Sequence, residues 1–150
     1  VSRRIRSRIR LPAGVRLQKT NDEEGAVGYQ IALFPPTVEQ GRRIAAALKV
    51  EGIPAYCRGR ERGTDWHCAT DMLPVTLKQG HTPEGSVFDD PRYIARGGKA
   101  PNYGRGALPV SEDLWTRGVF FWVDQWWTDG DCDAIAAGVN KLLAAEVTQR

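Results

Sequence analysis

LPVSEDLWTRGVFFWVDQWWTDGDCDAIAAGVNKLLAAE, residues 108–146, is the stretch that decides the fold of this chain. Residues 110–116 predict a short helix, because polar side chains there are interspersed with apolar ones. Residues 119–123 are very apolar, and this short run predicts a strand. A helix, a strand and a second helix in this order predict a domain in which helices pack on a small sheet.

A closing amphipathic helix is predicted after the strand. Thr128 is a suitable N-cap, and Asp129 and Asp131 in the first turn favour the positive end of the helix dipole. The apolar side chains recur with a helical period, at Cys132, Ile135, Ala136, Val139, Leu142 and Leu143. This face is expected to pack on the sheet.

A strand–helix–strand run precedes this stretch. Residues 27–34 predict a buried strand that carries Tyr29, Ile31 and Leu33. Thr37, with Gln40 three positions later, has the spacing of a capping box, and Gly52 is a natural helix stop. Residues 53–57 predict a second, short strand.

The remaining segments flank this run. Residues 1–10 predict a short basic helix with Ile5 and Ile9 on one stripe, and residues 21–25 predict a turn. The stretch 58–106 is rich in glycine and proline and predicts a long ordered excursion, with one or two helical turns within 66–73.

The composition indicates a globular protein. The 150 residues are 41% hydrophobic and 26% charged, with a net charge of +3. No apolar run reaches the roughly 18 residues of a membrane helix, and the arginine-rich N-terminus is unlike a secretory signal, so no membrane association is expected. The three cysteines, Cys57, Cys68 and Cys132, are interpreted as free thiols in the cytoplasm.

Zinc binding and nucleic-acid binding are two other functions that the residue types could suggest. Cys57, His67, Cys68 and His81 are suitable zinc ligands, but their spacings match no standard zinc pattern, so no metal site is predicted. The cluster RRIRSRIR, residues 3–10, could neutralise phosphates, but no nucleic-acid-binding module accompanies it, so no nucleic-acid partner is expected.

Three segments together resemble a known family. The element order in 108–146, the segment TDWHCATDMLPVTLKQGHTPEGSVFDDP at 64–91, and NYGRGALPVSED at 102–113 resemble the C-terminal small domain of the DegT/DnrJ/EryC1/StrS aminotransferases. Members of that family use pyridoxal phosphate (PLP) to aminate keto-sugars and cyclitol ketones. The resemblance implies an α+β fold, with a short mixed or antiparallel sheet, helices packed on it, and a long loop excursion.

The resemblance also implies a set of substrate-binding residues. Trp66 and His67 would face the ligand, His81 would orient the loop or touch the ligand, and Tyr103 and Arg105 would help to wall the cleft. Indole faces and imidazole hydrogen bonds suit a polyhydroxylated ring, and the guanidinium fork suits a carboxylate or phosphate. The competing interpretation is that these side chains only pack within an ordered loop.

The lysine that binds PLP as a Schiff base has no counterpart in this sequence. None of the five lysines lies in the Ser-x-x-x-x-Lys context of the family, namely Lys19, Lys49, Lys78, Lys99 and Lys141. No glycine-rich loop opens a helix to hold a phosphate. The expectation is therefore that a large partner subunit binds PLP covalently, in a heterodimer or a dimer of heterodimers, and that this chain supplies no catalytic residue.

The sequence-based prediction is thus one domain with four parts: a basic helical lead-in at 1–14, strand–helix–strand at 15–57, a ligand-facing excursion at 58–106, and helix–strand–helix at 107–150. We expect the small subunit of a split aminotransferase acting on a ketone and an amino donor. The alternative is a noncatalytic binding or regulatory module with the same fold.

An aromatic cluster departs from the family pattern, which has smaller aliphatic side chains on this strand. The cluster is Phe120, Phe121, Trp122, Trp126 and Trp127. A strand that is apolar on both faces is expected to be buried on both. One face should be core, and the other is expected to contact a partner rather than to form a cofactor site.

Overall fold

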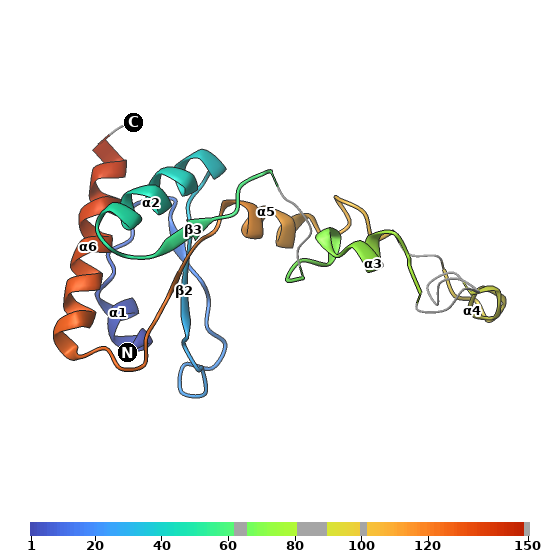
Figure 1. The fold of residues 1–150 in the computed structure, drawn as a ribbon, viewed down its shortest axis with the longest axis horizontal. Helices are drawn as coiled ribbons and strands as arrows, with labels where there is room; N and C mark the ends of the chain where they lie inside the picture. The colour runs from blue at the N-terminus through green and yellow to red at the C-terminus, as the bar shows by residue number, and fades with distance from the viewer. Residues whose placement is uncertain (62–65, 81–89, 100–101, 149–150) are drawn as a thin grey trace. The chain divides into compact units, whose positions relative to one another are not determined.

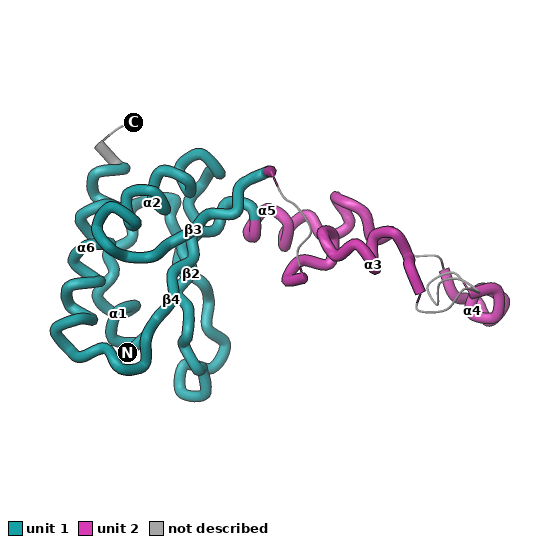
Figure 2. The backbone as a smooth tube through the Cα atoms, in the orientation of Figure 1, with its two compact units in different colours: residues 1–60, 116–150 teal, residues 61–115 magenta. Residues whose placement is uncertain are grey.

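A computed structural model describes residues 1–61, 66–80, 90–99 and 102–148. Residues 147 and 148 are described by their backbone alone. The chain forms two compact units, one made of residues 1–60 and 116–150 and the other of residues 61–115 (Figure 2). We call them unit 1 and unit 2 and describe each by itself.

Unit 1 is built on a four-stranded sheet in the order β1-β2-β4-β3, and every neighbouring pair is antiparallel. The strands are β1 (Arg16–Leu17), β2 (Gln30–Phe34), β3 (Ala55–Cys57) and β4 (Val119–Trp122). Since β2 and β3 both run antiparallel to β4, they are parallel to each other, and helix α2 (Val38–Val50) connects them. The result is a split β-α-β unit with β4 inserted between its two strands.

Helices α1 (Ser2–Arg8), α2 and α6 (Asp129–Thr148) pack together on one face of this sheet (Figure 1). Their apolar stripes meet the alternate side chains of the strands, and this contact forms the hydrophobic core. The core residues include Ile5 of α1, Ile44 and Leu48 of α2, Ile31, Leu33 and Phe121 of the strands, and Cys132, Val139 and Leu143 of α6. The predicted inward face of α6 is confirmed, with Ile135 and Leu142 at its partly buried margin.

The two long helices begin where the capping residues predicted. Thr37 Oγ1 accepts a hydrogen bond from the backbone N–H of Gln40 at 3.1 Å, which satisfies one of the free donors at the start of α2. At the start of α6, Thr128 and Asp131 cap each other: Thr128 Oγ1 accepts from the N–H of Asp131, and Asp131 Oδ2 accepts from the N–H of Thr128.

The opposite face of the sheet carries no helix of unit 1 and is aromatic. Phe120 is 4% exposed and lies between Tyr56, stacked at 5.3 Å between ring centroids, and Phe34, edge-on at 6.3 Å. Phe121 points to the core and is fully buried. The expectation that β4 is buried on both faces is therefore confirmed for Phe120 and Phe121.

The predicted strand at 27–34 was too long. β2 begins at Gln30, and Tyr29, predicted to be buried in it, is 59% exposed. The reason is Gly28, whose φ of +67° turns the chain out of the extended conformation. A side chain at that position would also strike Ser2, because its Cβ would lie 2.7 Å from the Cβ of Ser2.

Unit 2 contains short helices joined by irregular segments. They are η1 (Ala69–Asp71), α3 (Leu73–Thr76), α4 (Pro91–Ala95) and α5 (Pro109–Arg117), of which α5 ends within unit 1. The helical turns predicted within 66–73 are confirmed by η1. The described part of the chain is thus α+β with a small antiparallel sheet, as predicted, and it holds no helix that is both long and apolar enough to cross a membrane.

Candidate functional site

The residues predicted to contact a ligand begin at a small buried corner of unit 2. The backbone N–H of Asp71 donates to the carbonyl of Cys68 at 2.9 Å, and Cys68 Sγ lies 3.2 Å from Thr70 Oγ1. Cys68, Thr70 and Asp71 are all buried. This corner fixes the point from which the preceding residues, Trp66 and His67, project.

Trp66 and His67 differ in their surroundings. Trp66 is 66% exposed, so most of its indole is open to solvent. His67 is also exposed, but its ring lies against Trp115 of α5, with centroids 6.0 Å apart and planes tilted by 33°. This contact orients the imidazole, and Trp115 is the site residue that sequence reasoning missed. No local pattern could identify it, because His67 and Trp115 lie far apart in the sequence.

Tyr103 and Arg105 lie on a turn that precedes α5. Asn102 Oδ1 accepts from the N–H of Gly104 at 3.0 Å, and the Glu112 carboxylate accepts from the N–H of Gly106 at 2.9 Å. Glu112 also accepts from the N–H of Leu108, so this α5 side chain holds both the turn and the start of its own helix. Within this frame Tyr103 is half-buried, and Arg105 is exposed.

The fifth predicted residue, His81, lies outside the described residues. It is also one of the four side chains considered as zinc ligands. Across the described ranges, no group of three or more His, Cys, Asp or Glu side chains could hold a metal ion. The three cysteines are free. Burial raises the pKa of the Cys57 thiol, which keeps it protonated and poorly nucleophilic near neutral pH.

The lysines show whether this chain could hold PLP covalently. Lys19, Lys49, Lys99 and Lys141 are exposed, and Lys141 Nζ is paired with Glu51 Oε1 at 2.6 Å. Lys78 is partly buried, in a left-handed turn with φ of +52°. A Schiff-base lysine works inside a water-excluding site that lowers its pKa, and none of these five lysines is enclosed in that way. The residues present therefore do not fit covalent binding of PLP by this chain.

Phosphate binding by the two long helices is also disfavoured. Glu39 lies in the first turn of α2, and Asp129 and Asp131 lie in the first turn of α6. Carboxylates at these positions use the positive helix ends themselves and repel a phosphate. The N-termini of α2 and α6 are thus built for folding rather than for anion capture.

No protein-family model matches the sequence, and no curated protein matches it at a significant level. The arrangement of the described residues therefore carries the functional argument.

Proposed function

We propose that this chain is the small subunit of a split, cytoplasmic PLP-dependent aminotransferase that acts on a keto-sugar or cyclitol-like ketone. In this proposal a large partner subunit binds PLP through its own lysine. The present chain contributes unit 2 as the wall of the substrate site. The proposal extends the family resemblance to a protein of two chains.

The observation that carries the proposal is the composition of unit 2. Its buried residues, among those described, are only Cys68, Thr70 and Asp71, a small polar corner. Seven of its large apolar side chains are instead exposed: Trp66, Leu73, Leu77, Tyr93, Ile94, Leu108 and Val110. Exposed apolar residues on this scale mark a binding surface, and the described part of unit 2, with so few buried side chains, would gain stability from whatever covers it.

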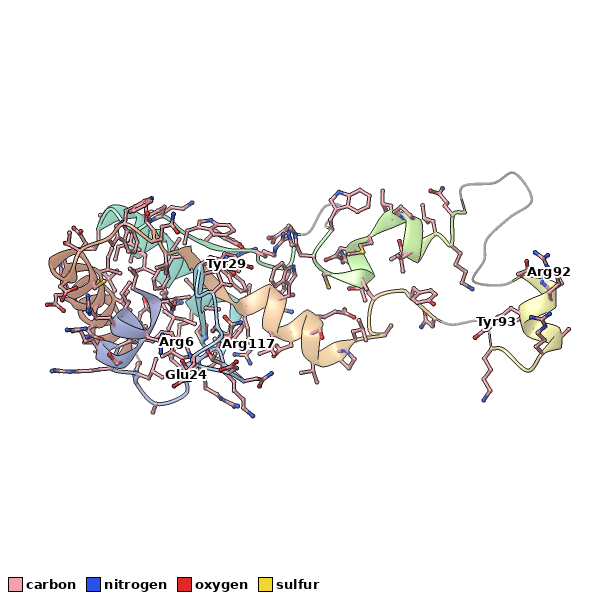
Figure 3. The ribbon with its side chains drawn as sticks, turned by 90° about the horizontal axis from the view of Figure 1, so that it is seen from below. Arg6, Glu24, Tyr29, Arg92, Tyr93 and Arg117 are labelled. Atoms are coloured by element: carbon pink, nitrogen blue, oxygen red, sulfur yellow. The ribbon has the colours of Figure 1, made fainter. Side chains whose placement is uncertain are left out.

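Helix α4 illustrates the same point. All five of its residues are exposed, and Arg92 and Tyr93 project from it (Figure 3). Asp90 caps it and is paired with Arg92, which holds the pKa of Asp90 at about 2. Isolated helices of this length are not stable in water, so we infer that α4 forms part of the contact with the partner.

Unit 1 supports the proposal through its topology and its separate core. Its small antiparallel sheet with helices packed on it agrees with the α+β fold that the resemblance implied, and its core is formed by residues of unit 1. Phe120 and Phe121 are buried and Trp127 is partly buried within this unit. The cluster members that remain exposed are Trp122 at 52% and Trp126 at 82%, and we assign the predicted partner contact to Trp126.

The exposure of these side chains is compatible with the proposed substrate-binding roles. Trp66 offers an open indole face to a ring, and the exposed imidazole of His67, which lies against Trp115, is proposed to contact a substrate hydroxyl. Tyr103 adds a phenol, and Arg105 offers a guanidinium for the carboxylate of an amino donor. His81 keeps its proposed role of orienting the loop or touching the ligand.

The decisive experiment is purification of the tagged chain from its native host together with its partner. We expect a partner with a PLP-binding lysine, which borohydride reduction labels, and a complex that aminates a keto-sugar or a keto-cyclitol. A partner that binds no PLP would overturn the proposal. The alternative of a noncatalytic regulatory module would be supported by a PLP-containing complex that lacks transaminase activity and whose assembly is unchanged by His67→Ala.

A further inference from the structure

The turn that carries Arg105 is tightly defined by its backbone. The N–H of Ala107 donates to the carbonyl of Gly104 at 3.1 Å, which closes a β-turn with Arg105 and Gly106 at its two central positions. The φ of Gly106 is +88°, a conformation that a type II turn requires at its second central residue and that glycine adopts readily. Arg105 therefore occupies the corner of a type II turn, where it is exposed.

Glu112 is the residue that ties this turn to a helix. Its carboxylate accepts from the N–H of Gly106, at 2.9 Å for Oε1 and 3.1 Å for Oε2, and Oε1 also accepts from the N–H of Leu108 at 3.2 Å. Glu112 lies in the first turn of α5, so these bonds anchor the Arg105 turn to that helix. Hydrogen bonds from a backbone N–H to a carboxylate are charge-assisted and stronger than neutral ones.

The arrangement leaves the Arg105 guanidinium to a ligand. Among the described residues, none forms an ion pair with Arg105, and the Glu112 carboxylate is engaged by backbone N–H groups instead. A group on a flexible loop loses conformational entropy when it binds, whereas one on an ordered backbone loses less. A fixed turn therefore favours the binding of an anionic group by Arg105.

We propose that Glu112 is a positioning residue for the amino donor. By holding the N–H groups of Gly106 and Leu108, it fixes the turn that presents Arg105 to the donor carboxylate. This inference rests on the proposed function, in which Arg105 binds that carboxylate. It adds that recognition of the donor depends on a side chain that acts through the turn and not on the donor itself.

The geometry is tested by NMR on the whole chain without a partner. The amide proton resonances of Gly106 and Leu108 should move as the pH is lowered through the range in which carboxyl groups take up protons, because the acceptor of both bonds then loses its charge. The same resonances should no longer respond in Glu112→Ala. Asp113→Ala is the matched control, since it removes the next carboxylate of α5, which accepts neither of these bonds. Resonances that ignore pH in the parent chain would overturn the inference.

The effect on the donor is measured in the complex with the PLP-binding partner. The donor is L-glutamate, or another α-amino acid if the complex prefers one, since each carries the same α-carboxylate. Glu112→Ala should lower kcat/KM for the donor about three- to tenfold and leave kcat/KM for the ketone unchanged, because the lost contact is to the donor alone. Glu112→Gln, which keeps an oxygen acceptor, should lose less. Asp113→Ala should match the parent for both substrates.

A double-variant cycle shows whether Glu112 acts through Arg105. Arg105→Ala should lower kcat/KM for the donor at least as much as Glu112→Ala does, and combining the two should cause no further loss. Additive losses, or equal losses for donor and ketone, would overturn the inference and leave the proposed function standing. A complex that binds no PLP or transfers no amino group would instead overturn the proposed function, and this inference with it.

Discussion

Arg43 on α2 donates both Nε and Nη2 to the same carboxylate oxygen of Glu146 on α6, at 3.2 and 3.0 Å. The Glu146 side chain is only 10% exposed, whereas that of Arg43 is 54% exposed. The charge-assisted pair therefore joins the two long helices at the edge of the core. The nearly buried carboxylate depends on it more than the arginine does.

The first prediction concerns this pair. Arg43→Ala should lower the free energy of unfolding by about 1–3 kcal/mol, because it leaves a buried acceptor without this partner. Arg43→Ala combined with Glu146→Leu should recover much of the loss, since no buried charge remains. Urea unfolding of Arg43→Ala, Glu146→Leu and the double variant measures both effects, and additive losses in the double variant would contradict the explanation.

The second prediction concerns Gly41 within α2. Alanine normally stabilises a helix interior relative to glycine, but a Cβ at Gly41 would lie 2.6 Å from the carbonyl oxygen of Arg117 and 3.0 Å from Cys57 Sγ. Gly41→Ala should therefore destabilise unit 1, by about 1–3 kcal/mol. Gly130→Ala in α6 is the control, because beyond the backbone of its own helix the nearest atom to its Cβ would be Thr128 Oγ1, at an ordinary contact distance of 3.7 Å. Thermal melting should show a loss for the first variant and little change or a gain for the second.

The third prediction concerns the cap of α6 and its dependence on pH. Thr128→Ala should cost about 1 kcal/mol of stability, and Thr128→Ser, which keeps the hydroxyl, much less. Hydrogen bonds from the Thr128 hydroxyl and N–H lower the pKa of Asp131 in the folded chain. Its contribution is thus fully present above the unfolded pKa of about 3.9 and is lost as the pH falls through the lower folded value.

The Asp131→Asn variant tests this pH dependence directly. Its melting temperature should fall less steeply than that of the parent between neutral and strongly acidic pH, because the titrating carboxylate is gone. Parallel pH profiles for the two proteins would show that Asp131 does not contribute in the way its cap geometry indicates.

The fourth prediction concerns His67 in the proposed complex of this chain with its PLP-binding partner. His67→Ala should reduce kcat/KM for the ketone up to about tenfold, through the loss of a hydrogen bond to a substrate hydroxyl, while assembly with the partner is unchanged. His67→Gln, which keeps a hydrogen-bonding group, should retain more activity. A lower melting temperature with an unchanged rate would show instead that His67 only packs against Trp115.

The predictability of the site differed between its parts. The sequence pattern located helical turns within 66–73, where the structure has η1, because such turns depend on neighbouring residues. The partner of His67 was not predictable, since Trp115 lies far along the chain, in α5. The exposure of Tyr29 was missed for a related reason: the alternating pattern at 27–34 favoured a buried tyrosine, and the positive φ of Gly28 removed it from the strand.

By itself the sequence determined the elements of unit 1: helices α2 and α6 with their caps, the apolar stripe of α6 and the strand character of β4. Helical period, capping and β-propensity are interactions within a few residues, and they need no tertiary partner to be recognised. Only the tertiary structure decided that β4 lies between β2 and β3, that the rings of Tyr29 and Trp122 lie against each other, and that seven large apolar side chains of unit 2 are exposed. These features depend on contacts between residues far apart in the chain, such as Arg43 and Glu146, which are separated by 103 positions, and such contacts leave no local pattern in the sequence.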